Sequence, residues 1–110
     1  MIQISITRDK SNCIRQIVIE GHAGYAKHGS DIVCAAVSVT AYTAAGALEE
    51  LAGVKGCYTA EDGYMMISLP DDIKGEQKRT AEIILETTVI GFKQIEMEYG
   101  KYISVLDEEV

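Results

Sequence analysis

Two isoleucine-rich runs at the start of the chain do most to restrict its fold. In MIQISITRD, Ile2, Ile4 and Ile6 alternate with polar residues, and this period of two is typical of a strand with one buried face. CIRQIVIEG is a second β-branched run, and the turn-forming residues DKSN lie between the two. The sequence therefore predicts a hairpin of strands at 2–8 and 13–20, and other elements have to cover its apolar face.

Two helices are predicted to provide that cover. In SDIVCAAVSVTAYTAAGALEELAG the apolar residues recur at helical spacing, with Ser30 or Asp31 as the cap and Gly53 or Gly56 as the end. A second helix is predicted over roughly 72–99. The residues expected to face inward are Val33, Val37, Ala41, Ala44, Leu48 and Leu51 in the first helix, and Ala81, Ile84, Leu85, Thr88, Phe92, Ile95 and Tyr99 in the second.

The remaining segments complete an α+β architecture. KGCYTAEDGYMMISLP predicts a second hairpin with Asp62-Gly63 as its two-residue turn, KYISVL a last strand, and DEEV a charged tail. The order β-β-α-β-β-α-β predicts a two-layer sandwich, in which a mixed sheet packs against two helices. A length of 110 residues with 47% hydrophobic content suits one domain over 1–110.

Charge and cysteine content limit the classes of function. Seventeen acidic residues against ten basic ones give a net charge of -7, which argues against direct nucleic-acid binding and more often serves solubility than a basic partner. Cys13, Cys34 and Cys57 lack any paired spacing, and Cys13 and Cys57 fall where structural cysteines are expected. With no signal peptide and no apolar run of membrane-spanning length, we expect a cytoplasmic protein with reduced thiols and no membrane association.

The stretch GHAGYAKHGSDIVCAAVS holds both histidines and one cysteine. Cys34 is expected in the first turn of the first helix, where free amides and the helix dipole favour a thiolate and could hold an oxyanion. His22 follows the second strand and could take the thiol proton and return it to a leaving amine. Asp31, Cys34 and Ser38, spaced i, i+3 and i+7, are expected on one stripe of the helix.

Each of these residues also has a simpler interpretation. A cysteine in an alanine-rich helix is usually a small buried hydrophobe, Asp31 can serve only as a cap, and the Ser38 hydroxyl can bond back to a helix carbonyl. His22, His28, Cys34 and Asp31 also carry the atom types that zinc accepts, although the close pair of ligands usual in structural sites is absent. Asp31 is expected on the cysteine side of the site, where its charge would raise the thiol pKa unless its oxygens cap the helix. It is therefore interpreted as an accessory residue rather than the partner of the base in a triad.

GHA, followed after a short glycine-containing loop by SDIVCAAVS, resembles the ribosomal-processing cysteine protease Prp family. The resemblance extends over the whole chain in length and element order. It implies that Cys34 is the catalytic nucleophile and His22 the catalytic base. It also implies that Gly21, Asp31 and Ser38 occupy further motif positions, with Ser38 lining the site.

The resemblance further implies an activity and its partners. Members of the family remove a short N-terminal extension from a bacterial large-subunit ribosomal protein, number twenty-seven of the L series, after a pair of aromatic residues, and so allow the ribosome to mature. They are homodimers without a cofactor or metal, and the loop before the helix is thought to be mobile until substrate binds. The alternatives are a non-catalytic ribosome-assembly module that binds basic proteins, and a small zinc-binding protein.

Overall fold

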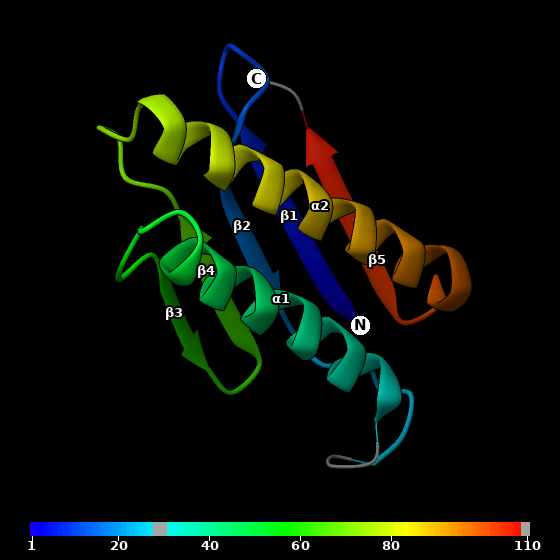
Figure 1. Ribbon diagram of the computed structural model, residues 1–110. Coiled ribbons are helices and arrows are strands. Elements are labelled where there is room, and N and C mark those ends of the chain that lie inside the picture. Colours follow the sequence, from blue (N-terminus) through cyan, green and yellow to red (C-terminus); the bar gives the residue numbers. More distant parts are fainter. Residues whose placement is uncertain (28–30, 109–110) are drawn as a thin grey trace.

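A five-stranded mixed sheet carries both helices on one of its faces (Figure 1). The structure, a computed structural model, describes residues 1–27 and 31–108. Its strand order is β3-β4-β2-β1-β5, in which β1 runs antiparallel to β2 and parallel to β5. The elements are β1 (Ile2–Arg8), β2 (Ile14–Glu20), α1 (Ile32–Glu50), β3 (Tyr58–Glu61), β4 (Tyr64–Ser68), α2 (Gly75–Tyr99) and β5 (Ile103–Glu108). The predicted α+β sandwich is confirmed.

The alternation in the first strands produces the core, as predicted. Ile2, Ile4 and Ile6 are buried, whereas the intervening Gln3 and Thr7 are exposed. Each buried isoleucine contributes roughly 1.5–3 kcal/mol by leaving water. Opposite them, the buried residues of the helices form the other half of the core: Val33, Val37, Ala41, Ala44, Ala45 and Leu48 in α1, and Ala81, Leu85, Thr88, Val89 and Phe92 in α2.

Two details of the helices differ from the prediction. Leu51 is 72% exposed because α1 ends at Glu50, so the inward stripe ends at Leu48. The second helix begins at Gly75 rather than near position 72, because the Ile73 amide bonds to the Pro70 carbonyl in a turn that buries Ile73. Both differences arise at helix ends, where sequence periodicity carries little information.

The last strand is longer at its C-terminal end than predicted. KYISVL was expected to form the strand and DEEV a charged tail, but β5 covers Ile103–Glu108. Its start is delayed because the Tyr102 amide bonds to the Tyr99 carbonyl at the end of α2. Its extension follows from parallel pairing with β1, in which Ile6 lies beside Asp107. The acidic residues at the end of the chain thus favour the prediction of a tail, although Asp107 and Glu108 belong to a paired strand.

The helix α1 contradicts the expectation that no apolar run reaches membrane-spanning length. It has 19 residues, and its best window has a mean hydropathy of 1.5. By length and composition alone it could cross a membrane, although one such helix is weak evidence because core helices pass the same test. In the fold its buried residues pack into the core described above.

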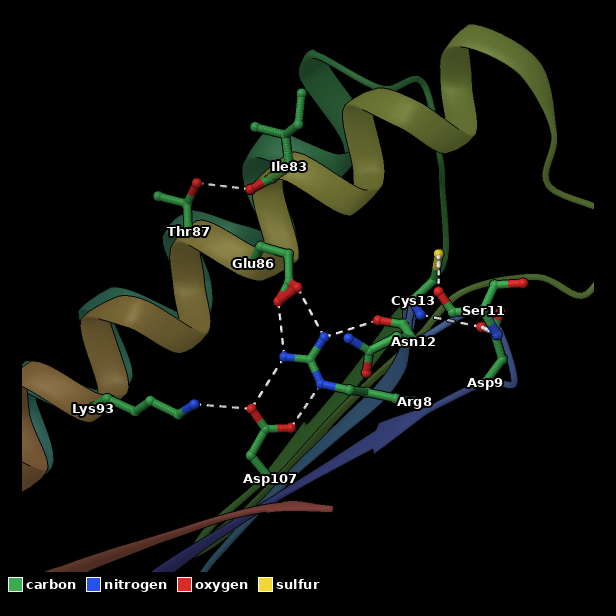
Figure 2. A network of polar contacts seen from close by, with 10 residues as sticks. All are labelled: Arg8, Asp9, Ser11, Asn12, Cys13, Ile83, Glu86, Thr87, Lys93 and Asp107. Atoms are coloured by element: carbon green, nitrogen blue, oxygen red, sulfur yellow. Dashed lines mark hydrogen bonds and ion pairs between the residues drawn. The ribbon is translucent and has the colours of Figure 1, made fainter. Parts of the chain in front are cut away.

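An ion-pair network around the buried Arg8 joins β1, β5 and α2 at one end of the sheet (Figure 2). The Arg8 guanidinium donates two hydrogen bonds to Glu86, both of 2.8 Å, and two to Asp107, of 2.7 and 3.0 Å. Lys93 donates a further bond of 2.9 Å to Asp107. The Arg8 bonds, with help from Lys93, outweigh burial and lower the pKa of Asp107 to about 2. We call these four residues the Arg8 cluster.

Candidate active site

A cavity of about 550 Å³ lies at the other end of the sheet, where β1 begins. Parts of β1, β2, α1 and the β3–β4 hairpin line it, together with the loop between β2 and α1. Its volume falls in the range of small-ligand sites. All five residues predicted for the site line this cavity: Gly21, His22, Asp31, Cys34 and Ser38.

Cys34 lies in the first turn of α1 and is half-buried, so it is neither fully enclosed nor fully exposed. The Ala23 backbone N–H donates a hydrogen bond of 3.2 Å to its Sγ atom. An N–H aimed at sulfur is the kind of interaction that a thiolate accepts. Since Ala23 directly follows His22, this bond also ties the histidine-bearing loop to the cysteine-bearing helix.

Asp31 caps α1 and holds the preceding loop at the same time. Its Oδ1 accepts hydrogen bonds from the Val33 and Cys34 amides, at 3.0 and 2.9 Å. Its Oδ2 accepts from the Tyr25 and Ala26 amides, at 3.0 and 3.4 Å. Burial opposes ionisation, but the four amide bonds outweigh it and lower the pKa of Asp31 below its ordinary value. Of the two capping residues considered, Asp31 is the cap, and Ser30 lies outside the described residues.

The same bonds correct the expected role of the helix amides. The Val33 and Cys34 amides are occupied by the Asp31 side chain, and the Ala35 amide donates to the Asp31 carbonyl at 3.0 Å. The Val33, Cys34 and Ala35 amides are therefore not free to hold an oxyanion in this conformation, contrary to the expectation for the first turn. One carboxylate satisfies two of these donors, as a strong N-cap does.

His22 is placed by the contact between its loop and the β3–β4 turn. The Gly21 amide donates to the Gly63 carbonyl at 2.8 Å, and the His22 Nε2 atom lies 3.9 Å from Asp62 Oδ1. Gly21 has a φ of 96°, and a Cβ atom there would strike the Met1 carbonyl oxygen. Only glycine suits that position, which explains its place before the histidine. His22 and Cys34 thus come from different elements and line one cavity.

Within the described ranges, no group of three or more His, Cys, Asp or Glu side chains is placed to hold a metal ion. His28, which the predicted zinc set includes, lies outside those ranges. Both Asp31 oxygens are engaged with backbone amides, so Asp31 is not available as a ligand in this conformation. The geometry therefore gives the zinc interpretation no support.

Sequence reasoning assigned no role to Tyr25, which anchors the loop before α1. Its ring makes edge contacts with Tyr99 and Tyr102, with centroids 5.9 and 5.1 Å apart. The nearest sequence signal is a single aromatic residue within a loop of small residues, and it does not identify the partners. With the bonds to Asp31, these contacts fix the described part of the loop, residues 21–27.

The other two cysteines lie away from the cavity, and all three thiols are within the described residues. Cys57 is buried, and burial raises its pKa. A hydrogen bond with Glu82 raises the pKa of Cys13. Both effects work against thiolate formation at these two residues. Of the three described thiols, that of Cys34 lines the cavity.

Comparisons with known proteins agree with this geometry. Residues 1–104 match the family described as cysteine protease Prp. The ribosomal processing cysteine protease Prp of Bacillus subtilis is 33% identical over 101 residues, which is 90% of each chain. A crystal structure of an essential ribosomal processing protease Prp from Staphylococcus aureus, in complex with a covalently linked product peptide, has a TM-score of 0.85 at 28% identity, covering 96% of this chain and 98% of that one.

A second Staphylococcus aureus Prp structure, in complex with a substrate peptide, has a TM-score of 0.81 at 25% identity and covers all of both chains. The family match and the relatives named as cysteine proteases make this chain an enzyme, a cysteine-type peptidase, and not a non-catalytic module. The chain belongs to the cysteine protease Prp family.

Proposed function

We propose that this chain removes the short N-terminal extension of a bacterial large-subunit ribosomal protein, number twenty-seven of the L series. The Bacillus subtilis relative is named for ribosomal processing, and the Staphylococcus aureus structures hold peptides. The net charge of -7 suits a basic ribosomal substrate. A ribosomal substrate supports a cytoplasmic location for the reaction, and the family resemblance supports a homodimer.

In the proposed reaction, Cys34 is the nucleophile and His22 the general base and acid. His22 takes the thiol proton as Sγ attacks the carbonyl carbon of the scissile bond, and the resulting intermediate expels the amine. His22 gives that amine its proton, which leaves a thioester between substrate and Cys34. Water then attacks the thioester, His22 takes the water proton and returns it to the sulfur, and the acid product leaves.

The observation that carries this proposal is the placement of Cys34 and His22 on one cavity, with the Ala23 amide bonded to the sulfur. Asp31 has an accessory role, because its four amide bonds hold the histidine loop against the head of α1. Ser38 lies one turn beyond Cys34 and lines the same cavity, where its hydroxyl can donate to substrate.

The cavity also suits an apolar substrate side chain. Residues of the sheet and of α1 contribute apolar groups to its wall: Ile2, Ile19, Val37, Ala41 and Met65. All five are buried, so an aromatic ring seated on them would lose most of its contact with water. This supports cleavage after aromatic residues, as the family resemblance implies.

The test is cleavage of the extended ribosomal precursor by wild type, Cys34→Ala and His22→Ala, with Cys13→Ala as the matched control. We expect both active-site variants to lose at least about a thousandfold in rate, because the two groups act as a unit, while Cys13→Ala cleaves normally. Thermal unfolding of each variant reports whether the fold is retained. Cleavage by Cys34→Ala at the wild-type rate would overturn the proposed mechanism. If the wild-type protein leaves the precursor intact, the proposed substrate is wrong.

A further inference from the structure

The β3–β4 turn contains an acidic residue that faces the histidine ring. Asp62 Oδ1 lies 3.9 Å from His22 Nε2, with 54% of the histidine side chain and 84% of the aspartate side chain exposed. The sequence indicates Asp62 only as the first residue of a two-residue turn, whereas in the structure it lies beside the proposed catalytic base.

Sheet register fixes this proximity. Glu20 on β2 pairs with Tyr64 on β4, and the chain continues two residues beyond Glu20 to His22 and two residues before Tyr64 to Asp62. The hydrogen bond from the Gly21 amide to the Gly63 carbonyl holds the residue before His22 against the residue after Asp62. The two side chains are therefore neighbours because antiparallel strands bring their ends together.

Gly63 leaves the space that the imidazole ring occupies. A Cβ atom at this position would lie 3.0 Å from His22 Nε2, closer than ordinary contact allows. The φ of 71° at Gly63 also favours glycine, as the second position of this hairpin turn requires. The turn thus presents a flat backbone surface and one carboxylate to the Nε2 side of the ring.

We propose that Asp62 is a positioning residue that holds His22 with Nε2 towards the turn, so that Nδ1 exchanges protons with Cys34. This rests on the proposed role of His22. Asp62 stabilises the imidazolium that forms when the thiol gives up its proton. The other acidic groups on the cavity are Glu61 at the end of β3 and Asp31 at the head of α1, and both oxygens of Asp31 face backbone amides.

The test compares precursor cleavage by wild type, Asp62→Asn and Asp62→Glu. Asp71→Asn is the matched control, because Asp71 is also an exposed turn aspartate and lies 3.6 Å from Arg15. We expect Asp62→Asn to lower kcat about two- to fivefold with KM unchanged, the range an exposed ion pair supports. Asp62→Glu should recover most of the loss, and Asp71→Asn should match wild type.

The salt dependence of kcat separates positioning by charge from a structural effect. About 1 M salt should screen the carboxylate and reduce the difference in kcat between wild type and Asp62→Asn. An unchanged kcat in Asp62→Asn, or an equal loss in Glu61→Gln, would overturn the proposal. If His22→Ala is inactive while Asp62→Asn behaves as wild type, only the proposed role of Asp62 is contradicted. If His22→Ala is active, the proposed function is contradicted as well.

Discussion

The two ends of the sheet use charge in opposite ways. At the end of β1, Arg8 is buried and makes four bonds of 2.7–3.0 Å to Glu86 and Asp107 (Figure 2). At the start of β1, the His22–Asp62 pair is 3.9 Å apart and largely exposed. Short bonds to a buried cation stabilise a fold strongly, whereas a long, exposed ion pair contributes little to stability.

One end of this small domain contributes mainly to stability, and the other end carries the candidate catalytic groups. The Arg8 cluster joins the edge strand β5 and the helix α2 to the neighbouring interior strand β1, so it holds the two layers together. The site end depends on backbone bonds and ring contacts around the loop. The proposed mechanism requires His22 to gain and lose a proton in each cycle. Substitutions in the Arg8 cluster are therefore expected to change the free energy of unfolding, and substitutions at the site end are expected to change the rate of cleavage.

The largest effect on stability is expected from Arg8→Met. Removing the guanidinium takes from Glu86 and Asp107 their bonds to Arg8 and leaves Asp107 paired with Lys93. Removing one partner of a buried ion pair costs about 3 kcal/mol. Urea unfolding measures this loss, and precursor cleavage per folded molecule should stay near the wild-type value.

Arg15→Met is the matched control for that experiment. Arg15 pairs at 3.6 Å with Asp71, whose side chain is fully exposed, so the loss should stay below about 1 kcal/mol. Equal losses in Arg8→Met and Arg15→Met would show that the Arg8 cluster is no stronger than a surface pair.

The next effect concerns acid stability. Because the Arg8 bonds hold the pKa of Asp107 at about 2 rather than 3.8, its ionised form stabilises the fold fully above pH 3.8. That contribution disappears as the pH falls through about 2. Between pH 5 and 2, wild type should lose about 2 kcal/mol more unfolding free energy than Asp107→Asn. Parallel curves for the two proteins, measured by urea unfolding at each pH, would contradict this.

A smaller effect is expected at the site end, from Tyr25→Ala. Losing the contacts with Tyr99 and Tyr102 should loosen the loop and weaken the bond from the Ala23 amide to Cys34. An aromatic pair contributes about 0.5–1.5 kcal/mol, which corresponds to a fall in kcat/KM of about two- to tenfold. Tyr25→Phe keeps both ring contacts and should cleave like wild type. Normal cleavage by Tyr25→Ala would show that the loop needs no aromatic anchor.

The sequence was sufficient for features that depend on local periodicity. The alternating isoleucines predicted β1 and the hairpin, and the Asp62-Gly63 turn appeared where expected. The five candidate site residues line one cavity because each stands at a strand end or on one helical stripe, positions that local patterns determine. Those patterns also gave the fold class.

Features that depend on contacts between distant segments were not predictable. Arg8 and Asp107 are 99 residues apart, and their pairing follows from the parallel register of β1 and β5. The acidic end of the chain resembles a solvated tail until that register is known. Likewise, nothing local indicates that Asp62 faces His22. Long-range pairing decides both, and one sequence carries no direct signal of it.

The reactivity of the three thiols within one molecule tests the account most directly. The folded protein is treated with limiting iodoacetamide, and the modified fraction of Cys13, Cys34 and Cys57 is followed by peptide mass mapping. We expect Cys34 to react at least about tenfold faster than the other two, and to lose that advantage in His22→Ala. Faster reaction at Cys13 or Cys57, or a Cys34 rate that does not depend on His22, would contradict the proposed cysteine–histidine site.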